Sequence, residues 1–220
     1  LFAKTIPTGI RHGTVTVLED GAKAEVTTYR ADGQYLDGRH PAAVTFVRSL
    51  PEDLARRDFT VNAMAMDEDG TLVDLYGGRA DLAAKLLRGV GDPTHRFEED
   101  ALRMLRAVRF AAQLGFTIES ETAAAIVRCA PLAERLSAER VSEELQKTLL
   151  SPRPELVGQM AAGGLLRLYG LLEARALAWI AALPAEPTVR FAALKQVYPE
   201  ADLSALRLPR RIIQDAVAVS

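Results

Sequence analysis

Two patterns of hydrophobic and polar positions divide the chain near residue 78. Before it, short runs rich in Val and Thr occupy residues 12–18 and 25–30, with an Asp20-Gly21 turn between them and a third run at residues 42–47. β-branched residues bounded by Asp-Gly pairs are typical of antiparallel strands. Residues 1–50 are therefore predicted to be rich in β-structure.

The segments around the third run are less regular. Residues 30–41 contain two Asp-Gly pairs and a proline, which predicts a mobile loop. Residues 51–65 are predicted as a helix, and Asp69-Gly70 as a turn leading into a last strand over residues 71–75.

Beyond residue 78, apolar positions recur with helical spacing, and helices are predicted at 79–88, 98–114, 120–130, 137–150 and 153–163. The 98–114 helix has a buried stripe that includes Leu102, Leu105 and Val108, and Gly115 is expected to end it. Strands followed by a run of helices predict an α+β fold.

Composition limits the possible functions only loosely. The 220 residues are 49% hydrophobic and 25% charged, which suits one large domain or two to three small ones. The net charge of −2 provides no global attraction to nucleic acid. The basic residues are 22 Arg and 5 Lys. The planar fork of Arg matches phosphates and base edges, although a GC-rich genome explains the bias equally well.

Targeting and metal signals are missing from the sequence. The single Cys129 excludes a disulfide framework and a Cys-based zinc site. The histidines, His12, His40 and His95, lack the spacing of metal ligands, so no metal ligand is predicted. With no signal peptide and no apolar run of about 18 residues, a cytoplasmic protein without membrane contact is expected.

A dense polar cluster occupies residues 56–63 and includes Arg56, Arg57, Asp58 and Asn62. On a helix Asp58 and Asn62 share one face. There they could hold a ribose hydroxyl while Arg57 meets a phosphate through charge-assisted hydrogen bonds. On spacing alone, a solvated amphipathic helix is the simpler interpretation.

A second cluster lies on the 98–114 helix, where Arg103, Arg106 and Arg109 recur at every third residue and Asp100 is the i,i+3 neighbour of Arg103. A carboxylate beside a guanidinium can meet the Watson–Crick edge of a base. The acid accepts from the exocyclic amine of cytosine or adenine, and uracil and guanine do not present the same pattern. The alternative is a surface ion pair worth roughly 0.2–0.5 kcal/mol.

The chain contains four long motifs, RRDFTVNAMAM at 56–66, DLYGGRADL at 74–82, RFEEDALRMLRAVRFAAQLGF at 96–116 and SAERVSEEL at 137–145, preceded in order by HGTVTV, EVTTYR and DGRHP. These motifs resemble those of class II tRNA nucleotidyltransferases and poly(A) polymerases, the family that includes CCA-adding enzymes. The resemblance covers about residues 5–150. It implies an incomplete, polymerase-beta-like head over 1–76, a neck with the nucleotide-selecting helix over 77–136 and a helical body over 137–220.

The resemblance also implies roles for individual residues. Arg57 would meet the triphosphate, while Asp58 and Asn62 would hold the ribose. Asp100 and Arg103 would select the base. The same helix would support the phosphate or the pocket through two further arginines, Arg106 and Arg109. Glu25, on the strand EVTTYR, lies where the family can place a third, catalytic carboxylate near its metals.

The sequence departs from the family pattern at its start. The family's Gly-Gly-x-Val-Arg-Asp segment and Asp-x-Asp pair, expected before HGTVTV, are not in the sequence. Such phosphoryl transfer uses two divalent metals held by carboxylates, and Glu25 alone cannot hold two. Mg²⁺ ligands are therefore expected upstream of Leu1, which is not a methionine, and a tRNA-gripping tail is expected beyond the C-terminus.

The implied reaction transfers CMP and AMP from CTP and ATP to the 3′ end of tRNA and releases pyrophosphate. Within the family, the alternatives are a poly(A) polymerase or an enzyme that adds only CC or only A. From another class, the alternative is a non-catalytic fragment that binds nucleotide or RNA.

Overall fold

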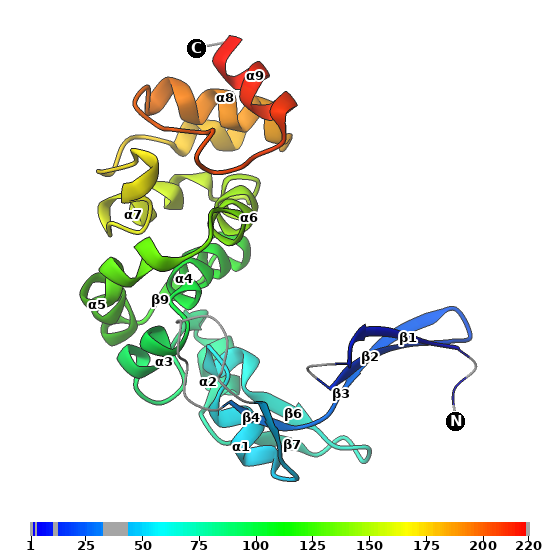
Figure 1. Ribbon diagram of the computed structural model, residues 1–220. Coiled ribbons are helices and arrows are strands. Elements are labelled where there is room, and N and C mark those ends of the chain that lie inside the picture. The colour runs from blue at the N-terminus through cyan, green and yellow to red at the C-terminus, as the bar shows by residue number, and fades with distance from the viewer. Residues whose placement is uncertain (1, 3, 11–12, 33–43, 219–220) are drawn as a thin grey trace.

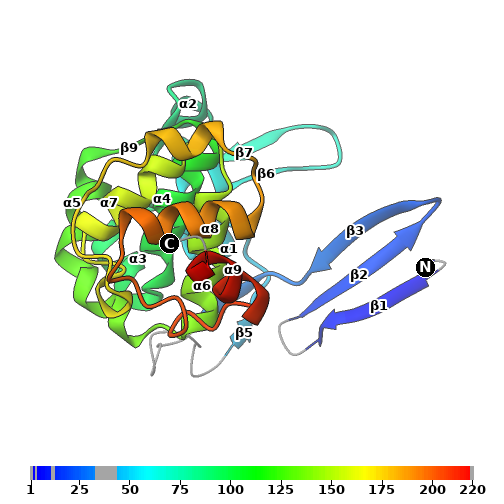
Figure 2. The same cartoon turned by 90° about the horizontal axis from the view of Figure 1, so that it is seen from above.

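The computed structural model describes residues 2, 4–10, 13–32 and 44–218. Their helices form a curved column from α2 and α3 up to α9, and a three-stranded sheet stands away from its lower end (Figure 1). Seen from above, the sheet projects to one side of the stacked helices (Figure 2). This arrangement confirms the predicted α+β fold.

The projecting sheet contains three antiparallel strands in the order β1-β2-β3, namely β1 (Lys4–Gly9), β2 (Thr14–Glu19) and β3 (Ala22–Thr27). Asp20 and Gly21 both have positive φ, 47° and 80°, and make the predicted hairpin turn. Thr16 and Val17 are buried in the central strand, whereas every residue of β3 is exposed. The sheet therefore has little core of its own.

Two short ribbons follow, β4 (Arg30–Asp32) with β5 (Val44–Phe46) and β6 (Met64–Met66) with β7 (Leu72–Asp74). The prediction of a loop from residue 30 is wrong at its start, because residues 30–32 form β4. The rest of that loop, residues 33–41, lies outside the described residues.

The predicted 51–65 helix is wrong beyond residue 55. α1 (Leu50–Ala55) ends there, and only the single turn η2 (Thr60–Asn62) is helical before β6. Asp58 accepts a hydrogen bond from the Phe59 amide at 2.9 Å, and Phe59 forms a β-bridge with Gly89. Both interactions take the backbone out of the helical pattern.

The column is built from the helices α2 (Gly78–Ala83), α3 (Pro93–Glu99), α4 (Leu102–Leu114), α5 (Ser120–Cys129), α6 (Ala138–Leu149), α7 (Val157–Ala162), α8 (Pro187–Val197) and α9 (Arg210–Ala218). Short 3₁₀ segments connect them at η3 (Ala130–Arg135), η4 (Pro154–Leu156), η5 (Arg167–Tyr169) and η6 (Ala178–Ala182). A parallel pair, β8 (Leu86–Leu87) and β9 (Thr117–Ile118), replaces the end of the predicted 79–88 helix. No helix in the described part of the chain is long and apolar enough to span a membrane.

α4 is the central helix of the column and packs against α6. Leu105 and Val108 are buried as predicted, and Gly115 ends the helix with a φ of 69°. The predicted 98–114 helix is nevertheless two helices. Asp100 breaks it with φ −143° and ψ 103°, and its Oδ1 accepts from the Leu102 amide at 3.0 Å. The break places Asp100 just before α4 begins.

Candidate nucleotide-binding site

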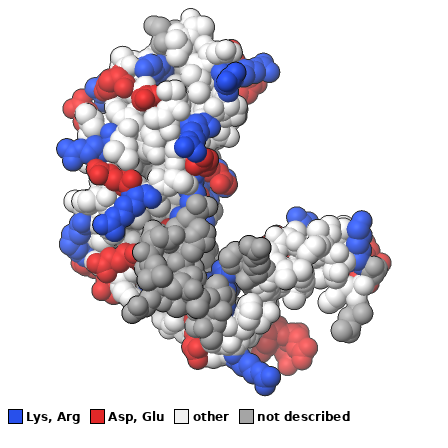
Figure 3. All heavy atoms as spheres, viewed as in Figure 1, with Lys and Arg blue, Asp and Glu red and all other residues white. Residues whose placement is uncertain are grey.

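A cavity of about 640 Å³ opens between the sheet, α1 and the start of α4. Figure 3 shows the molecule hollowed between the helical column and the sheet. Six arginines and three aspartates line the cavity together with Thr14, Thr27, Tyr29, Asn62 and Leu102; the charged residues are Arg30, Asp53, Arg56, Arg57, Asp58, Asp100, Arg103, Arg106 and Arg140. Because arginines outnumber acids by three, the cavity suits an anionic ligand.

The end of α1 is fixed to the column by two arginines of α3 and α4. Arg96 Nη1 donates to the Ala55 carbonyl at 2.9 Å, and Arg103 Nη2 donates to the Arg56 carbonyl at 2.9 Å. The last carbonyls of a helix have no partner within it, and a cation there is favourable. These bonds hold the segment that carries Arg56 and Arg57 against the neck.

Asp58 and Asn62 lie together in the cavity wall, although no helix joins them. Asp58 Oδ1 accepts from the Asn62 side-chain amide at 3.2 Å, and Asp58 Oδ2 accepts from Arg106 Nη2 at 2.6 Å and Nε at 2.8 Å. Arg57 Nη1 donates to the Asn62 carbonyl at 3.0 Å. With the Phe59 amide also bonded, the Asp58 carboxylate is fully engaged, so Asn62 is the better placed of the two to meet a ribose hydroxyl.

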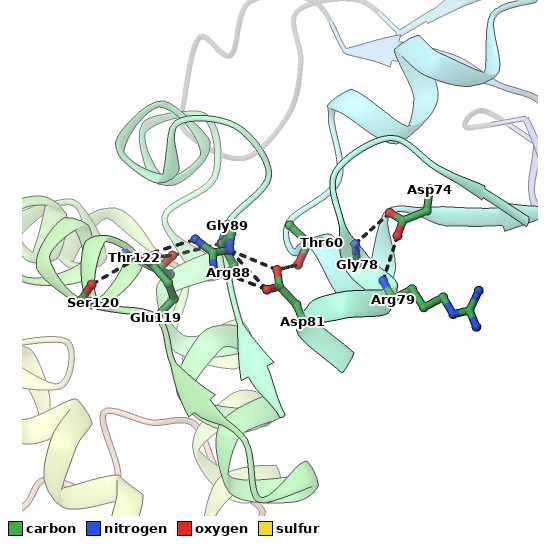
Figure 4. Close-up of polar contacts among 10 residues, drawn as sticks. All are labelled: Thr60, Asp74, Gly78, Arg79, Asp81, Arg88, Gly89, Glu119, Ser120 and Thr122. Atoms are coloured by element: carbon green, nitrogen blue, oxygen red, sulfur yellow. Dashed lines mark hydrogen bonds and ion pairs between the residues drawn. The ribbon is translucent and has the colours of Figure 1, made fainter. Parts of the chain in front are cut away.

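A partly buried polar network supports this segment (Figure 4). Asp81 of α2 accepts from the Thr60 hydroxyl at 2.7 Å and from Arg88 Nε at 3.1 Å. Arg88 also lies 3.7 Å from Glu119. A side chain at Gly78 would clash with the Thr60 carbonyl, so α2 approaches η2 as closely as glycine permits. The network fixes the backbone that carries Asn62.

Asp100 and Arg103 line the cavity, but they do not bond to each other through their side chains as an i,i+3 pair would. Asp100 Oδ2 accepts from Arg140 Nη2 of α6 at 2.8 Å. Arg103 Nη1 donates to Glu99 Oε2 at 2.6 Å and to the Arg96 carbonyl at 3.1 Å. Both side chains are therefore fixed by neighbours instead of by one another.

Two predicted residues lie outside the cavity lining. Arg109 is buried, pairs with Glu144 of α6 and Gln113, and stacks on Phe110 at 3.9 Å. In this position Arg109 joins α4 to α6, and its support of the phosphate or the pocket stays a prediction. Glu25 is exposed on β3, on the same face of the strand as the cavity-lining Thr27.

The structure adds lining residues that sequence reasoning missed. Arg140 lies in the SAERVSEEL motif and Arg30 ends EVTTYR, so both stood in recognised motifs without a distinct signal of their own. Asp53 had no signal, because an acid in the first turn of a helix is ordinary. Its bonds to Arg56 and Arg57 are i,i+3 and i,i+4 contacts that helical spacing allows, whereas only the fold brings it to the Arg30 amide.

Two family models match the sequence. One describes the poly A polymerase head domain and matches residues 1–88, and the other describes a probable RNA and SrmB-binding site of polymerase A and matches residues 115–173.

Named relatives agree with these models. The chain is 46% identical over 230 residues to a CCA-adding enzyme of Geobacillus thermodenitrificans, an alignment that covers 100% of the chain and 57% of the relative. It is 56% identical over 155 residues to a CCA-adding enzyme of Levilactobacillus brevis, covering 70% of the chain and 39% of the relative. The alignments thus span a little more than half of the first relative and less than half of the second.

Solved structures extend the likeness to the fold. The Bacillus stearothermophilus CCA-adding enzyme in complex with CTP superposes with a TM-score of 0.83 at 40% identity, covering 99% of this chain and 55% of that one. The Thermotoga maritima CCA-adding enzyme complexed with tRNA gives 0.66 at 21% identity, covering 98% and 55%, and shares the fold alone.

Proposed function

The chain belongs to the tRNA nucleotidyltransferase and poly(A) polymerase family, and from that premise we propose that it supplies the nucleotide-binding part of a CCA-adding enzyme. The reaction would move CMP and AMP from CTP and ATP to tRNA. The terminal 3′ hydroxyl oxygen would bond to the α-phosphorus as the bond to the departing pyrophosphate breaks. Relatives named CCA-adding enzymes along the whole chain support this proposal.

The observation that carries the proposal is a connected set of groups around one cavity. Arg57 bonds to the backbone of Asn62, Asn62 bonds to Asp58, and Asp58 pairs with Arg106, one turn beyond Arg103 on α4. The guanidinium of Arg57 would meet the triphosphate, Asn62 the ribose, and the start of α4 the base. A cavity of about 640 Å³ has the size of a small-molecule site.

Base selection would fall to Asp100 with Arg103. Each Asp100 oxygen accepts one of the bonds described above, from Leu102 and Arg140, and a carboxylate oxygen can accept two. The exocyclic amine of cytosine or adenine would supply the second. Arg103, anchored by Glu99, would donate to the ring nitrogen or carbonyl.

The chemistry of phosphoryl transfer needs more than these groups. Nucleotidyltransferases of this family generally use a divalent metal. Among the described residues, no three His, Cys, Asp or Glu side chains come together to hold one. We therefore assign no step of the reaction to a metal on these residues. Mg²⁺ held by ligands upstream of Leu1, with Glu25 as a third carboxylate, remains a proposal.

The test uses the full-length protein and all four nucleoside triphosphates. Asp100→Ala should relax discrimination against UTP, because a lost bidentate base contact is worth about 1–3 kcal/mol. Glu98→Ala, an exposed acid two residues away, is the matched control. An unchanged preference for CTP and ATP in Asp100→Ala would exclude the base-selecting role.

The same assay separates the alternatives. A poly(A) polymerase would add many AMP units without CMP, and CC-only or A-only enzymes would stop after one kind of nucleotide. A non-catalytic fragment would bind CTP and tRNA without transfer. The division into a head over 1–76, a neck over 77–136 and a body over 137–220, and action in the cytoplasm, remain proposals.

A further inference from the structure

A buried carboxylate stands between the two arginines at the end of α1. Asp53 is only 3% exposed, yet it lines the cavity. Its Oδ1 accepts from Arg56 Nη2 at 2.6 Å and Nε at 3.1 Å, and its Oδ2 accepts from Arg57 Nη2 at 3.1 Å. Each carboxylate oxygen therefore holds one guanidinium.

Asp53 also joins these arginines to the other wall of the cavity. The Arg30 amide of β4 donates to Asp53 Oδ1 at 3.3 Å. Burial by itself would raise the pKa of Asp53. The hydrogen bonds and charge of Arg56, the Arg30 amide and Arg57 outweigh burial and lower the pKa below its ordinary value. Asp53 is therefore held as an anion.

A negative charge at Asp53 offsets the repulsion between the two neighbouring arginines. Arg56 and Arg57 are neighbours in sequence and both line the cavity, so their guanidinium groups repel one another. Long arginine side chains also lose rotamer freedom when a ligand immobilises them. A carboxylate that holds both during folding removes this cost from the binding step.

We propose that Asp53 is a positioning residue that presents Arg56 and Arg57 together to the phosphates of the incoming nucleotide. The inference rests on the proposed function, since it takes the ligand to be a nucleoside triphosphate. Asp53 itself does not touch the phosphates, because its oxygens already face the two arginines and like charges repel. It acts on the phosphate end of the cavity and leaves the base end unchanged.

The experiment compares CTP with CMP, because CMP retains the base and ribose but lacks two phosphates. Binding of each to the full-length protein is measured by isothermal titration. In Asp53→Asn, affinity for CTP should fall about tenfold, the size expected when hydrogen bonds to charged groups are lost. Affinity for CMP should change less than about twofold.

Matched variants sharpen the comparison. Glu52→Gln removes the same charge from the exposed neighbouring residue of α1, and its CTP affinity should stay within about twofold of wild type. Asp53→Glu keeps the charge but displaces it by one methylene. It should lose about threefold in CTP affinity, and it carries the test if Asp53→Asn does not fold.

Two results would overturn the inference while the proposed function stands. Equal losses for CTP and CMP would show that Asp53 supports only the fold. Stronger CTP binding in Asp53→Asn would show that Asp53 merely competes with the phosphates. A wild-type protein that binds CTP no better than CMP would instead reject the phosphate end of the site, and the proposed function would fail together with the role of Asp53.

Discussion

The two walls of the cavity are built in opposite ways. The sheet contributes Thr14 and Thr27 from strands whose buried side chains are confined to Thr16 and Val17, and Tyr29 follows from the link after β3. The neck contributes residues of α4, a helix in which nine of thirteen residues are buried. The arginines of the neck wall are also held by hydrogen bonds and ion pairs to acids and carbonyls on neighbouring elements.

The difference indicates which wall of the cavity fixes its side chains in a defined geometry. A side chain fixed by a packed core and several hydrogen bonds can distinguish one base edge from another. A ribbon with little core can close a cavity but holds its side chains less firmly. We therefore expect selectivity to depend on the neck wall and the sheet wall to contribute enclosure.

The largest contrast should come from a core leucine of α4. Leu105 is fully buried, and Leu105→Ala should lower the free energy of unfolding by about 3 kcal/mol through lost burial and a cavity. Leu114→Ala, at a half-exposed position of the same helix, should change it by less than about 1 kcal/mol. Urea denaturation of both variants measures this. Similar losses in the two variants would contradict the central, packed position of α4.

The polar network under η2 can be broken next. Asp81→Asn weakens the acceptor for the Thr60 hydroxyl and for Arg88, and should cost about 1–2 kcal/mol. Asp69→Asn, in the exposed β6–β7 turn, should change stability by less than about 0.5 kcal/mol. The discriminating measurement is amide exchange at Asn62, which should accelerate in Asp81→Asn only. Unchanged exchange would place the support of this segment elsewhere.

Low pH should destabilise the fold of the neck, because it protonates Glu119. Burial would raise the pKa of Glu119, but hydrogen bonds from Thr122 and the Glu121 amide, with the charge of Arg88, outweigh it and lower the pKa. A carboxyl whose pKa is lowered in the folded state stabilises the fold fully above its unfolded pKa, which is about 4.3 for glutamate. That stabilisation is lost as the pH falls through the folded-state pKa. Urea midpoints should therefore drop below about pH 4.3. Glu119→Gln should drop less steeply, and an identical slope would contradict this role.

The smallest effect is expected in the sheet. The hydroxyls of Thr14 and Thr27 lie 3.0 Å apart across the strands, and Thr27→Val should cost about 0.5 kcal/mol or less. Because the wall mainly encloses, CTP affinity should change less than about twofold. Titration of CTP into this variant checks the comparison most directly. A tenfold loss of CTP affinity would show that the sheet wall contributes to binding as strongly as the neck wall.

Local signals in the sequence predicted the elements that depend on local physics. The Asp20-Gly21 hairpin and the Gly115 helix end require positive φ, which these residue types tolerate. The sequence analysis did not predict the break at Asp100. It could have predicted the separate helix α3, because Asp92 followed by Pro93 is a helix-start signal and α3 begins there. The motif resemblance named Arg57, Asp100 and Arg103, which line the cavity, but also Arg109 and Glu25, which do not.

The direction of Arg109 could have been worked out from the sequence, but the contact between Asp53 and β4 could not. Each three-residue step on a helix turns by about 300°, so Arg109 lies about 120° around from Arg103 and faces α6. Asp53 depends on β4, which contacts it from a segment more than twenty residues earlier in the chain. Such contacts are properties of the folded topology and have no local periodicity.

The joint between the sheet and the rest of the molecule has a mechanical consequence. Residues 28 and 29 link β3 to β4, so any swing of the three-stranded sheet would pivot near the cavity. A six-residue strand is about 20 Å long, and a swing of about 10° would move its far end by about 3.5 Å. Thr27, next to the pivot, would move by roughly 0.6 Å. The cavity edge would therefore move very little while the far end of the three-stranded sheet moves through solvent.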